Sequence, residues 1–405
     1  MRGIAISPSK HWHLQTQNTP LKQTNRTILL NPIVQFGKKQ NPSNGRYPVL
    51  SSAIDPSKTQ APVTPIPSTS SPLLVVGSAN ADIYVEIDRL PKEGETISAK
   101  TGQTLAGGKG ANQAACGGKL SYPTYFLGQV GEDAHGKLIT EALENGGVRL
   151  NYLSTVAAAP TGHAVVMLQS DGQNSIIIVG GANMNCWPET LSEEDLEVVK
   201  NAGIVLLQRE IPDSVNIQVA KLLLSLFSAI WKYNVWSFAP SDITLCTQTA
   251  RNAGVPVILD AGGMDAPLPQ GLLNCVDILS PNESELSRLT VMPTESFEQI
   301  TEAVVLCHKM GIKQVLVKLG AKGSALFVEG EDPIKQPAIS AARVIDTTGA
   351  GDTFTAAFAV ALVEGKPRKE CLKFAAAAAS LCVQVKGAIP SMPDRKSVLD
   401  LLQSL

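Results

Sequence analysis

Short apolar runs recur along the chain after residue 72, and stretches with helical character separate them. The first run, Leu73 to Val76, is closed by Gly77 and is typical of a buried strand. Similar runs follow at residues 203–207, 255–260, 276–280 and 313–319. Strands that alternate with helices predict a mainly parallel sheet covered on both faces, which is the doubly wound α/β class.

A second pattern predicts a smaller sheet. The stretch HAVVMLQSDGQNSIIIVGG holds two β-rich runs, separated by turn residues that include Asp171 and Gly172, and this is a hairpin signal. Together with DIYVEI and ETISAKTGQTLAG it predicts a small β-sheet lid over the main domain, built from about residues 81–106 and 161–181.

The segment 222–249 breaks this pattern. It contains two of the four tryptophans and only two charged residues, yet its apolar part is too short and interrupted for a membrane span. If Lys221 were joined directly to Ala250, one uninterrupted helix–Gly–strand unit would result. The segment is therefore interpreted as an insertion, such as a translated intron or a gene-model error. The alternative is a genuine extra helical hairpin.

The N-terminal part differs in composition from the rest. Residues 1–54 contain seven Lys or Arg and no Asp or Glu, and they are rich in hydroxyl and amide side chains. This composition predicts an organelle transit peptide, with a plastid as the destination, and a cytoplasmic or mitochondrial location as the alternative. The other interpretation is a disordered tail. Residues 55–71 form a Pro/Ser-rich linker.

The overall composition excludes several classes of protein. The formal net charge of −2 gives no sign of a nucleic-acid or anionic-membrane partner. Seven scattered cysteines without a CxxC pair indicate free thiols in a reducing compartment. The five histidines include one close pair, His11 and His13, so no zinc cluster is expected.

The motif DTTGAGDTF places a carboxylate at a sharp glycine-rich bend before a long apolar run. Gly349 and Gly351 let the backbone approach a ligand, and the free N–H groups of a helix start attract an anion. Asp352 stands beside these donors, where it can accept a proton from an attacking hydroxyl. The alternative is a helix-capping aspartate in an ordinary turn.

A second glycine motif, AGGKGANQA, is not a Walker A loop, because Gly110 rather than Ser or Thr follows Lys109. Lys109 and Asn112 are instead available for a polar small molecule. Upstream, GSANAD places Asn80 and Asp82 at the end of the first strand, where ligands bind in open α/β sheets. These two side chains can hold vicinal hydroxyls, although Asn and Asp are also common in turns.

Two further motifs follow strands. SPNESE offers Asn282 and Glu285, which could act near a magnesium ion through water, but which also fit a helix start with an acidic first turn. The stretch VKLGAKGSALFV is either a nucleotide-side loop or a Gly-containing hairpin. No G-x-G-x-x-G fingerprint is present, so dinucleotide binding is not supported.

Taken together, these motifs identify the chain as similar to the ribokinase-type (PfkB) carbohydrate kinases. GSANAD, GGKGAN, GGAN, SPNESE, KLGAKG, DTTGAGDTF and KGAIPSMP occur in the order and approximate spacing of that family. The resemblance covers roughly 72–221 and 250–403, so it implies one kinase domain over residues 72–403. GGKGAN with NAD resembles the ribose-specific branch rather than the fructose or adenosine kinases.

The resemblance implies roles for individual residues. Asp352 would be the general base, and Gly349, Ala350 and Gly351 would form the anion hole. The sugar would be held by Asn80, Ala81, Asp82, Gly108, Lys109, Gly110, Ala111, Asn112, Glu210 and Asp352. ATP would be held by Asn282, Lys318, Leu319, Gly320, Ala321, Lys322, Gly323, Gly351, Asp352 and Ala376. Magnesium would be bound through water near Glu285, and potassium at Asp346, Thr348, Cys382, Val385, Gly387 and Ser391.

The expected activity is ATP-dependent phosphorylation of D-ribose at O5, with Mg²⁺ and an activating K⁺ as cofactors. The expected assembly is a homodimer formed through the lid sheet, with no nucleic-acid or membrane partner. A kinase for another sugar or nucleoside is the alternative within the same class. The alternative from another class is a catalytically impaired sugar-binding protein, disabled by the 222–249 insertion.

Overall fold

The chain folds around a large mainly parallel sheet, as the apolar pattern predicts. The computed structural model describes residues 71–170, 174–234, 254–264 and 266–405. Within these residues one sheet has nine strands in the order β13-β12-β11-β10-β9-β8-β1-β4-β5, parallel except at β12 and β13. The strands are β1 (Leu73–Val76), β4 (Thr124–Gly131), β5 (Arg149–Val156), β8 (Ile204–Arg209), β9 (Val257–Gly263), β10 (Ile278–Ser280), β11 (Gln314–Lys318), β12 (Ser324–Val328) and β13 (Ile334–Gln336).

The central strands are apolar throughout because helices cover both faces of the sheet. In β1, Leu73 and Val75 join one buried cluster, whereas Leu74 and Val76 join the other. This alternation follows from the two-residue period of a strand, and it explains why the run lacks polar positions. The first face is covered by α1 (Lys109–Lys119), α2 (Ala134–Asn145), α9 (Ala350–Val363), α10 (Arg368–Cys382) and α12 (Arg395–Gln403). The second is covered by α3 (Glu193–Lys200), α4 (Asp213–Asn234), α6 (Gln270–Leu273), α7 (Glu283–Thr290) and α8 (Phe297–Lys309).

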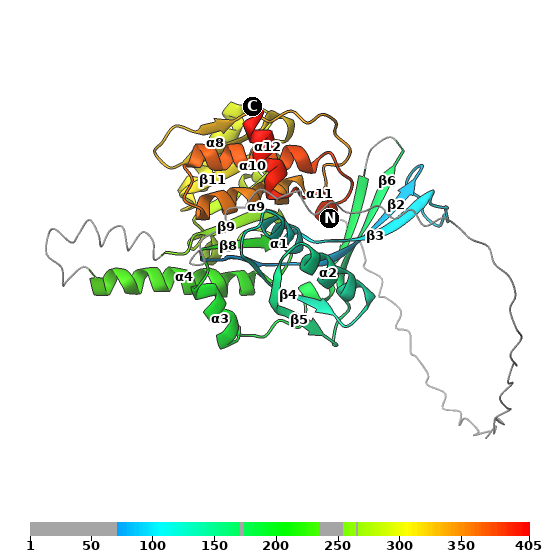
Figure 1. The fold of residues 1–405 in the computed structure, drawn as a ribbon, viewed down its shortest axis with the longest axis horizontal. Helices are drawn as coiled ribbons and strands as arrows, with labels where there is room; N and C mark the ends of the chain where they lie inside the picture. The colour runs from blue at the N-terminus through cyan, green and yellow to red at the C-terminus, as the bar shows by residue number, and fades with distance from the viewer. Residues whose placement is uncertain (1–70, 171–173, 235–253, 265) are drawn as a thin grey trace, which may run out of the picture. The chain divides into compact units, whose positions relative to one another are not determined.

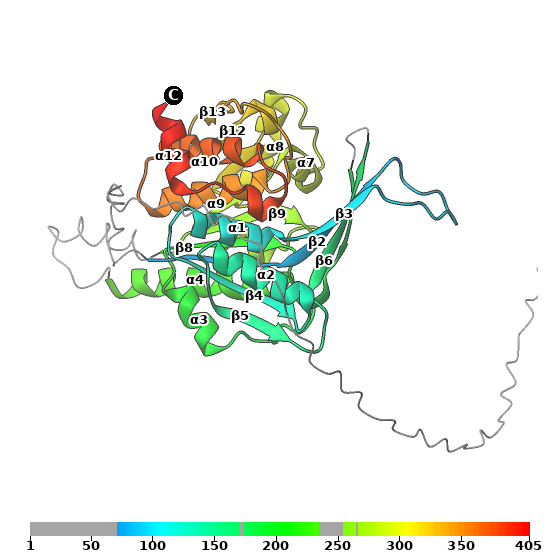
Figure 2. The same cartoon turned by 45° about the vertical axis from the view of Figure 1, so that its right-hand side comes forward.

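A separate four-stranded sheet has the order β3-β2-β6-β7 within the described residues. Its strands are β2 (Asn80–Ile87), β3 (Thr101–Gly107), β6 (Gly162–Gln169) and β7 (Asn174–Val179). In Figures 1 and 2, β2, β3 and β6 run side by side and extend beyond the helices of the main body. The predicted hairpin is present as the antiparallel pair β6–β7, although its Asp171-Gly172 turn lies outside the described residues. We call this four-stranded sheet the lid.

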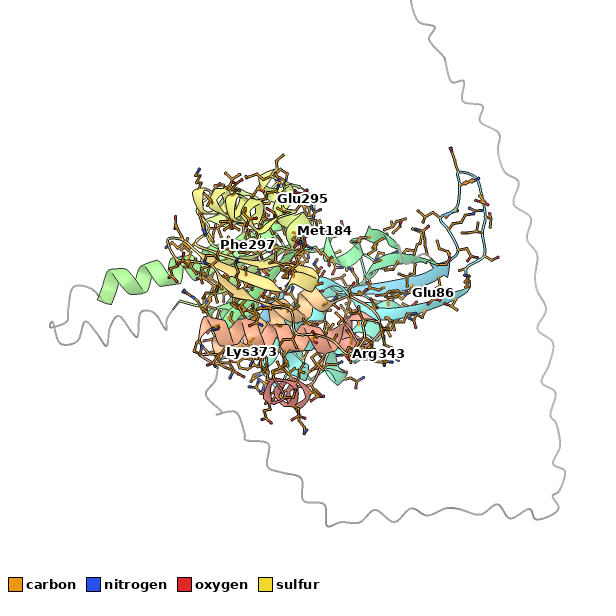
Figure 3. The ribbon with its side chains drawn as sticks, turned by 90° about the horizontal axis from the view of Figure 1, so that it is seen from above. Glu86, Met184, Glu295, Phe297, Arg343 and Lys373 are labelled. Carbon is orange, nitrogen blue, oxygen red and sulfur yellow. The ribbon has the colours of Figure 1, made fainter. Side chains whose placement is uncertain are left out.

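The lid is joined to the main body by polar contacts as well as by the chain. Glu86, labelled on the lid ribbon in Figure 3, forms an ion pair of 2.7 Å with Lys386. Lys386 lies just before the short helix α11 (Ala388–Ser391). The pair is largely exposed, so its contribution to the stability of the folded state is small.

Helix α4 begins before the predicted insertion 222–249 and continues without a break into the first part of that segment. Leu222 and Leu223 pack against the second cluster, and Leu223 is buried. The helix runs up to Asn234, whereas residues 235–249 lie outside the described part of the chain, so the choice between an insertion and a genuine helical hairpin stays a prediction. The N-terminal segment 1–54 and most of the 55–71 linker also lie outside it. No helix of the described residues is both long enough and apolar enough to cross a membrane.

Candidate active site

Helix α9 begins with a backbone that leaves amide donors available. Its N-cap is Gly349, whose φ of 76° lies in the left-handed region that favours glycine, and no side chain caps the helix. The Ala350 amide donates to the Thr347 carbonyl at 3.2 Å, whereas the Gly351 and Asp352 amides have no hydrogen-bond partner in the described chain. The positive end of the helix dipole therefore presents two open N–H groups, which suits an anion.

Asp352 lies in the first turn of α9 and is buried, with 6% of its surface exposed. Asn112 Nδ2 donates to its Oδ2 at 2.9 Å, and Gln113 Nε2 donates to its Oδ1 at 3.3 Å. Lys109 Nζ lies 3.8 Å from the same Oδ1. Burial raises the pKa of Asp352 above its ordinary value, although Lys109 opposes the shift. A carboxylate with a raised pKa is a stronger base than an exposed one.

Several of the residues expected to hold the sugar lie next to Asp352. Ser78 Oγ and the Lys109 amide donate to Glu210 Oε2 at 2.6 and 3.1 Å. Burial, followed by the charges of Glu210 and Asp352, raises the pKa of Asp82 to about 7. These three carboxylates repel one another, so a ligand that brings several hydroxyl donors among them is favoured.

Asn112 provides an acceptor at the same place. Its Nδ2 is used by Asp352, but its Oδ1 is buried and has no hydrogen-bond partner in the described structure. An unpaired buried oxygen of this kind is costly, and a ligand hydroxyl would satisfy it. The sequence interpretation assigned Asn112 to the sugar alone, whereas the structure also places it against Asp352.

Asn80 and Asp82 lie on the lid strand β2 rather than at the end of β1, where the sequence interpretation put them. β1 ends at Val76, and Asn80 already pairs with Gly107 of β3 and Gly162 of β6. Asn80 Oδ1 accepts a hydrogen bond of 2.7 Å from Asn183 Nδ2. Asn80 and Asp82 are therefore part of the lid and would move with it.

Asn183 was not singled out from the sequence, although it belongs to the GGAN motif. It is buried, and it bonds both the amide and the carbonyl of Ala79, at 2.9 and 3.0 Å. It thus fixes the backbone just before Asn80, and GGAN was the signal that could have found it.

The glycines of GGKG allow α1 to start against β2. A Cβ at Gly107 would collide with the Asp82 carboxylate, and one at Gly108 would lie 2.6 Å from the Asn80 amide. A Cβ at Gly110 would lie 2.6 Å from the Ser78 amide. Ala81 and Ala111, which were also expected at the sugar, are fully buried.

Asn282 and Glu285 form the start of helix α7. The Asn282 side chain accepts from the Glu285 amide, and the Glu285 carboxylate accepts from the Asn282 amide, each at 2.8 Å. This reciprocal pair is a capping box, the helix-start alternative that the sequence allowed. The other carboxylate oxygen, Oε1, lies near Lys109 Nζ. A Cβ added at Gly262 would lie 2.5 Å from Lys109 Nζ and 2.6 Å from Glu285 Oε1, so both atoms border the same small space. Glu285 therefore lies close to the charged side chains around Lys109.

The KLGAKG stretch is a tight connection between two antiparallel strands. A 3₁₀ turn, η2 (Gly320–Lys322), joins β11 to β12, and Gly320 and Gly323 have φ of 53° and 99°. Lys318, at the end of β11, pairs with Asn282 in an isolated parallel bridge. Lys322 forms an ion pair of 2.9 Å with Glu283. The structure places Leu319 and Ala321 in this connection and buries Ala376 within α10.

Asp260 joins the site, although the sequence interpretation treated it only as the end of a strand. It is fully buried, and its Oδ2 accepts from Lys318 Nζ at 2.6 Å. Lys109 Nζ lies 3.5 Å from its Oδ1. The signal in the sequence was a carboxylate at the carboxyl end of the VPVILD run, the edge where ligands bind. Gln113, which contacts Asp352, was missed as well.

The residues expected to hold potassium gather behind the α9 start. Asp346 Oδ1 accepts from the Thr348 amide at 2.9 Å, and Oδ2 accepts from the Gly387 amide at 2.8 Å. Cys382 Sγ lies 3.0 Å from Ser391 Oγ, and the Val385 amide donates to the Cys382 carbonyl at 3.2 Å. Burial raises the pKa of Asp346, but these hydrogen bonds outweigh it and hold the pKa below its usual value. In the described residues, no group of three or more His, Cys, Asp or Glu side chains could hold a metal ion.

Comparison with known proteins shows which family the chain belongs to. Residues 71–395 match the model of the pfkB family carbohydrate kinases. The chain is 64% identical over 399 residues to a ribokinase of Arabidopsis thaliana, covering 95% of this chain and 98% of that protein. It is 34% identical over 330 residues to a ribokinase of Bacillus subtilis, covering 82% and 99% of the two chains. A solved structure of Arabidopsis thaliana ribokinase complexed with ribose and ATP superposes with a TM-score of 0.73, at 71% identity and with 82% and 99% coverage.

Proposed function

Because the chain belongs to the pfkB family of carbohydrate kinases, we propose that it transfers the γ-phosphoryl group of ATP to O5 of D-ribose, giving D-ribose 5-phosphate and ADP. The observation that carries this proposal is the position of Asp352. It is buried between the open amides of α9 on one side and the hydroxyl-binding group of Asn112, Asp82 and Glu210 on the other. The ribokinases of Arabidopsis thaliana and Bacillus subtilis support ribose as the sugar.

The proposed reaction is an in-line displacement at phosphorus. Asp352 accepts the proton of the ribose O5 hydroxyl while O5 forms a bond to the γ-phosphorus, and the bond to the bridging oxygen of ADP breaks. The negative charge on the transferring group develops next to the Gly351 and Asp352 amides, which are already oriented in the free protein. Phosphoryl transfer depends chiefly on such positioning and charge stabilisation.

The lid supplies the remaining requirement, which is exclusion of water. Asn80 and Asp82 sit on β2, so sugar binding and lid closure are linked through the same strand. A closed lid prevents transfer of the phosphoryl group to water.

ATP-dependent kinases of this kind use a divalent metal, and we propose Mg²⁺. Glu285 fits a water-mediated role, because its Oε1 faces the site while Oε2 is used by the capping box. The metal would neutralise charge on the ATP phosphates. An absolute requirement for a divalent cation, removed by EDTA and restored by Mg²⁺, is the expected result.

We also propose potassium as an activating ion, held by Asp346 and by backbone carbonyls around Thr348 and Cys382. A cation there would fix the loop that carries Gly349 without taking part in the chemistry. Turnover should be faster in KCl than in an equal concentration of tetramethylammonium chloride. Equal rates in the two salts would refute the proposal.

The activity is tested with purified protein, ATP and a panel of ribose, deoxyribose, fructose and adenosine. Ribose should give the largest kcat/KM, and phosphorus NMR should identify the 5-phosphate. Preference for another substrate would favour a different kinase of the family. Ribose binding without ATP consumption would favour an impaired sugar-binding protein.

The proposed assembly is a homodimer through the lid. Three consecutive isoleucines of β7, Ile176, Ile177 and Ile178, are 52–57% exposed on a strand at the edge of the sheet. An exposed apolar edge of this kind favours association with a second copy. Ile177→Lys should halve the mass measured by sedimentation, while Val344→Lys, at an exposed valine outside the lid strands, should not. A monomeric wild-type protein would contradict the proposal.

We propose import into a plastid, directed by residues 1–54. The support is their basic, acid-free composition. A fluorescent reporter fused after residue 70 should enter plastids, and a purely cytosolic signal would refute this destination.

A further inference from the structure

Asp260 is held by donors from four different elements. Its Oδ2 accepts from Lys318 Nζ of β11 at 2.6 Å and from Thr355 Oγ1 of α9 at 3.2 Å. Its Oδ1 accepts from the Gly262 amide of β9 at 3.0 Å and lies 3.5 Å from Lys109 Nζ of α1. Full burial of a carboxylate is tolerated only when it is paired and hydrogen-bonded in this way.

The two lysines that Asp260 contacts both lie beside the reacting groups. A Cβ added at Gly351 would lie 4.0 Å from Lys318 Nζ, so this ammonium is next to the open amides of α9. Lys109 Nζ is shared between two carboxylates, at 3.5 Å from Asp260 and 3.8 Å from Asp352. Asp260 therefore contacts the lysines that border the expected phosphoryl position, but does not border that position itself.

Two ammonium groups, Lys109 and Lys318, pair with two carboxylates, Asp260 and Asp352. Glu285 and Glu210 add further negative charge near Lys109. If Asp260 were neutral, Lys109 would have one fewer carboxylate to pair with, and it would move toward Asp352. The closer ion pair would lower the pKa of Asp352 and weaken it as a base, and Lys318 would lose the carboxylate that sets its direction.

From this arrangement we propose that Asp260 is a positioning residue for phosphoryl transfer. It directs the Lys318 ammonium toward the transferring phosphoryl group, and it prevents Lys109 from pairing fully with Asp352. This inference rests on the proposed kinase reaction, and it assigns to a buried strand-end carboxylate a role in orienting the cations of the site.

Thr355 supports the same arrangement. It lies three residues after Asp352, hence on the same face of α9. Its hydroxyl is 3.2 Å from Asp260 Oδ2, 3.5 Å from Lys318 Nζ and 3.2 Å from Ser280 Oγ. The helix that carries the base is thus hydrogen-bonded directly to the carboxylate that orients the lysines, so the two are fixed relative to each other.

The test uses the full-length protein with Asp260→Asn, which keeps size and polarity but removes the charge. We expect kcat to fall about 10²-fold, the scale of a misplaced reacting group. The ribose Kd from calorimetry should change much less than kcat, because Asp260 reaches the sugar site only through Lys109. A merely structural role would lower the melting temperature and leave kcat per folded molecule unchanged, and that result would overturn the proposal.

A double-mutant cycle with Lys318→Met gives the second readout. If Asp260 acts through Lys318, each single variant should lose most of the rate, and the double variant should lose little more. Independent effects that multiply would overturn the proposal. Should the Asn variant fail to fold, Lys318→Met decides alone, because a near wild-type kcat would mean that no cation is being positioned.

Asp394→Ala is the control for stability. Asp394 accepts from the Ser397 amide at 2.9 Å and caps α12, so removal of its side chain should lower stability without changing kcat. Wild-type turnover of ribose, measured in parallel, separates failure of this inference from failure of the proposed function. An inactive wild-type protein would overturn both, whereas an active Asp260→Asn enzyme would overturn only the role of Asp260.

Discussion

Two helices, α7 and α9, begin close to the candidate active site. The first amides of α7 are hydrogen-bonded by side chains of the helix start, whereas those of α9 are not. At α7 the Asn282 and Glu285 side chains bond the amides of each other, so the helix satisfies its own donors. At α9 the N-cap is Gly349, no side chain caps the helix, and the Gly351 and Asp352 amides stay open. A capped start gains stability from its own residues, whereas an uncapped start keeps its donors for a ligand.

The same difference appears in the carboxylate of each first turn. Glu285 is the third residue of α7 and accepts from a backbone amide of its own helix start. Asp352 is the third residue of α9, but its contacts come from another helix, through Asn112 and Gln113. Equal positions in two helices therefore carry different functions, and substitutions at each can test that distinction.

The largest effect is expected for Asp352→Asn. The amide cannot accept the O5 proton, and general-base catalysis contributes about 10²–10⁴-fold, so kcat should fall by that factor. Ribose binding, measured by calorimetry, should be largely retained because the side chain keeps its size. Near wild-type kcat would mean that Asp352 only caps the helix.

The pH dependence of the wild-type enzyme follows from the same residue. Burial raises the pKa of Asp352, and the deprotonated form is the base. The rate should therefore fall as the pH is lowered through that raised pKa, at a higher pH than an exposed aspartate would give. An acid limb of kcat at the pKa of an ordinary aspartate, near 4, would contradict the assignment.

Gly349→Ala should have the next largest effect. The residue has a φ of 76°, where an alanine costs about 1–2 kcal/mol, and its Cβ would lie 3.0 Å from Ala388 Cα. Displacement of the α9 start by a fraction of an ångström should lower kcat about tenfold or more. Gly365→Ala, at a similar φ of 78° but with no atom within 4 Å of its Cβ, is the matched control. Gly365→Ala should lower the stability but leave kcat unchanged. An equal loss of kcat in both variants would argue against a catalytic role for the open amides of α9.

Asn112→Ala should act more weakly, and mainly on KM. It removes the unpaired Oδ1 that we assign to a ribose hydroxyl, together with the hydrogen bond to Asp352. Loss of one hydrogen bond to the sugar, about 0.5–1.5 kcal/mol, corresponds to a rise of about 2- to 13-fold in the ribose KM. Steady-state kinetics separate the two contacts, because a fall in kcat alone would show that Asn112 serves only the base.

The sequence predicted the sheet well because the central strands are buried on both faces. Leu73 to Val76 and residues 204–207 alternate between two clusters, so no polar position interrupts them and the apolar run marks the strand directly. The glycine motifs also marked the helix starts. The lid position of Asn80 was not predicted, because its strand is defined by pairing with β6, about 80 residues away in the chain.

Asp260 and Gln113 were missed for a related reason. Asp260 ends a strand, and Lys109 reaches it from a residue 151 positions earlier. Gln113 contacts Asp352 across 239 positions. Periodicity reports which face of an element is buried, but it does not report which distant side chains the crossover connections bring together. A buried carboxylate at the carboxyl end of a strand is the one local sign that such a partner exists.

The smallest effect is expected for Asn282→Ala, which tests the capped helix directly. Loss of an N-cap side chain costs about 1 kcal/mol of unfolding free energy, and chemical denaturation measures it. Ser296→Ala is a matched control, because Ser296 and Gln299 form the same capping box at α8. Both variants should lose similar stability. The Asn282 side chain lies beside the KLGAKG connection and is proposed to contact ATP, so only Asn282→Ala should raise the KM for ATP, by a few-fold. An unchanged KM for ATP would restrict Asn282 to capping, and the contrast with α9 would then be complete, since one helix start would serve only the fold and the other only the reaction.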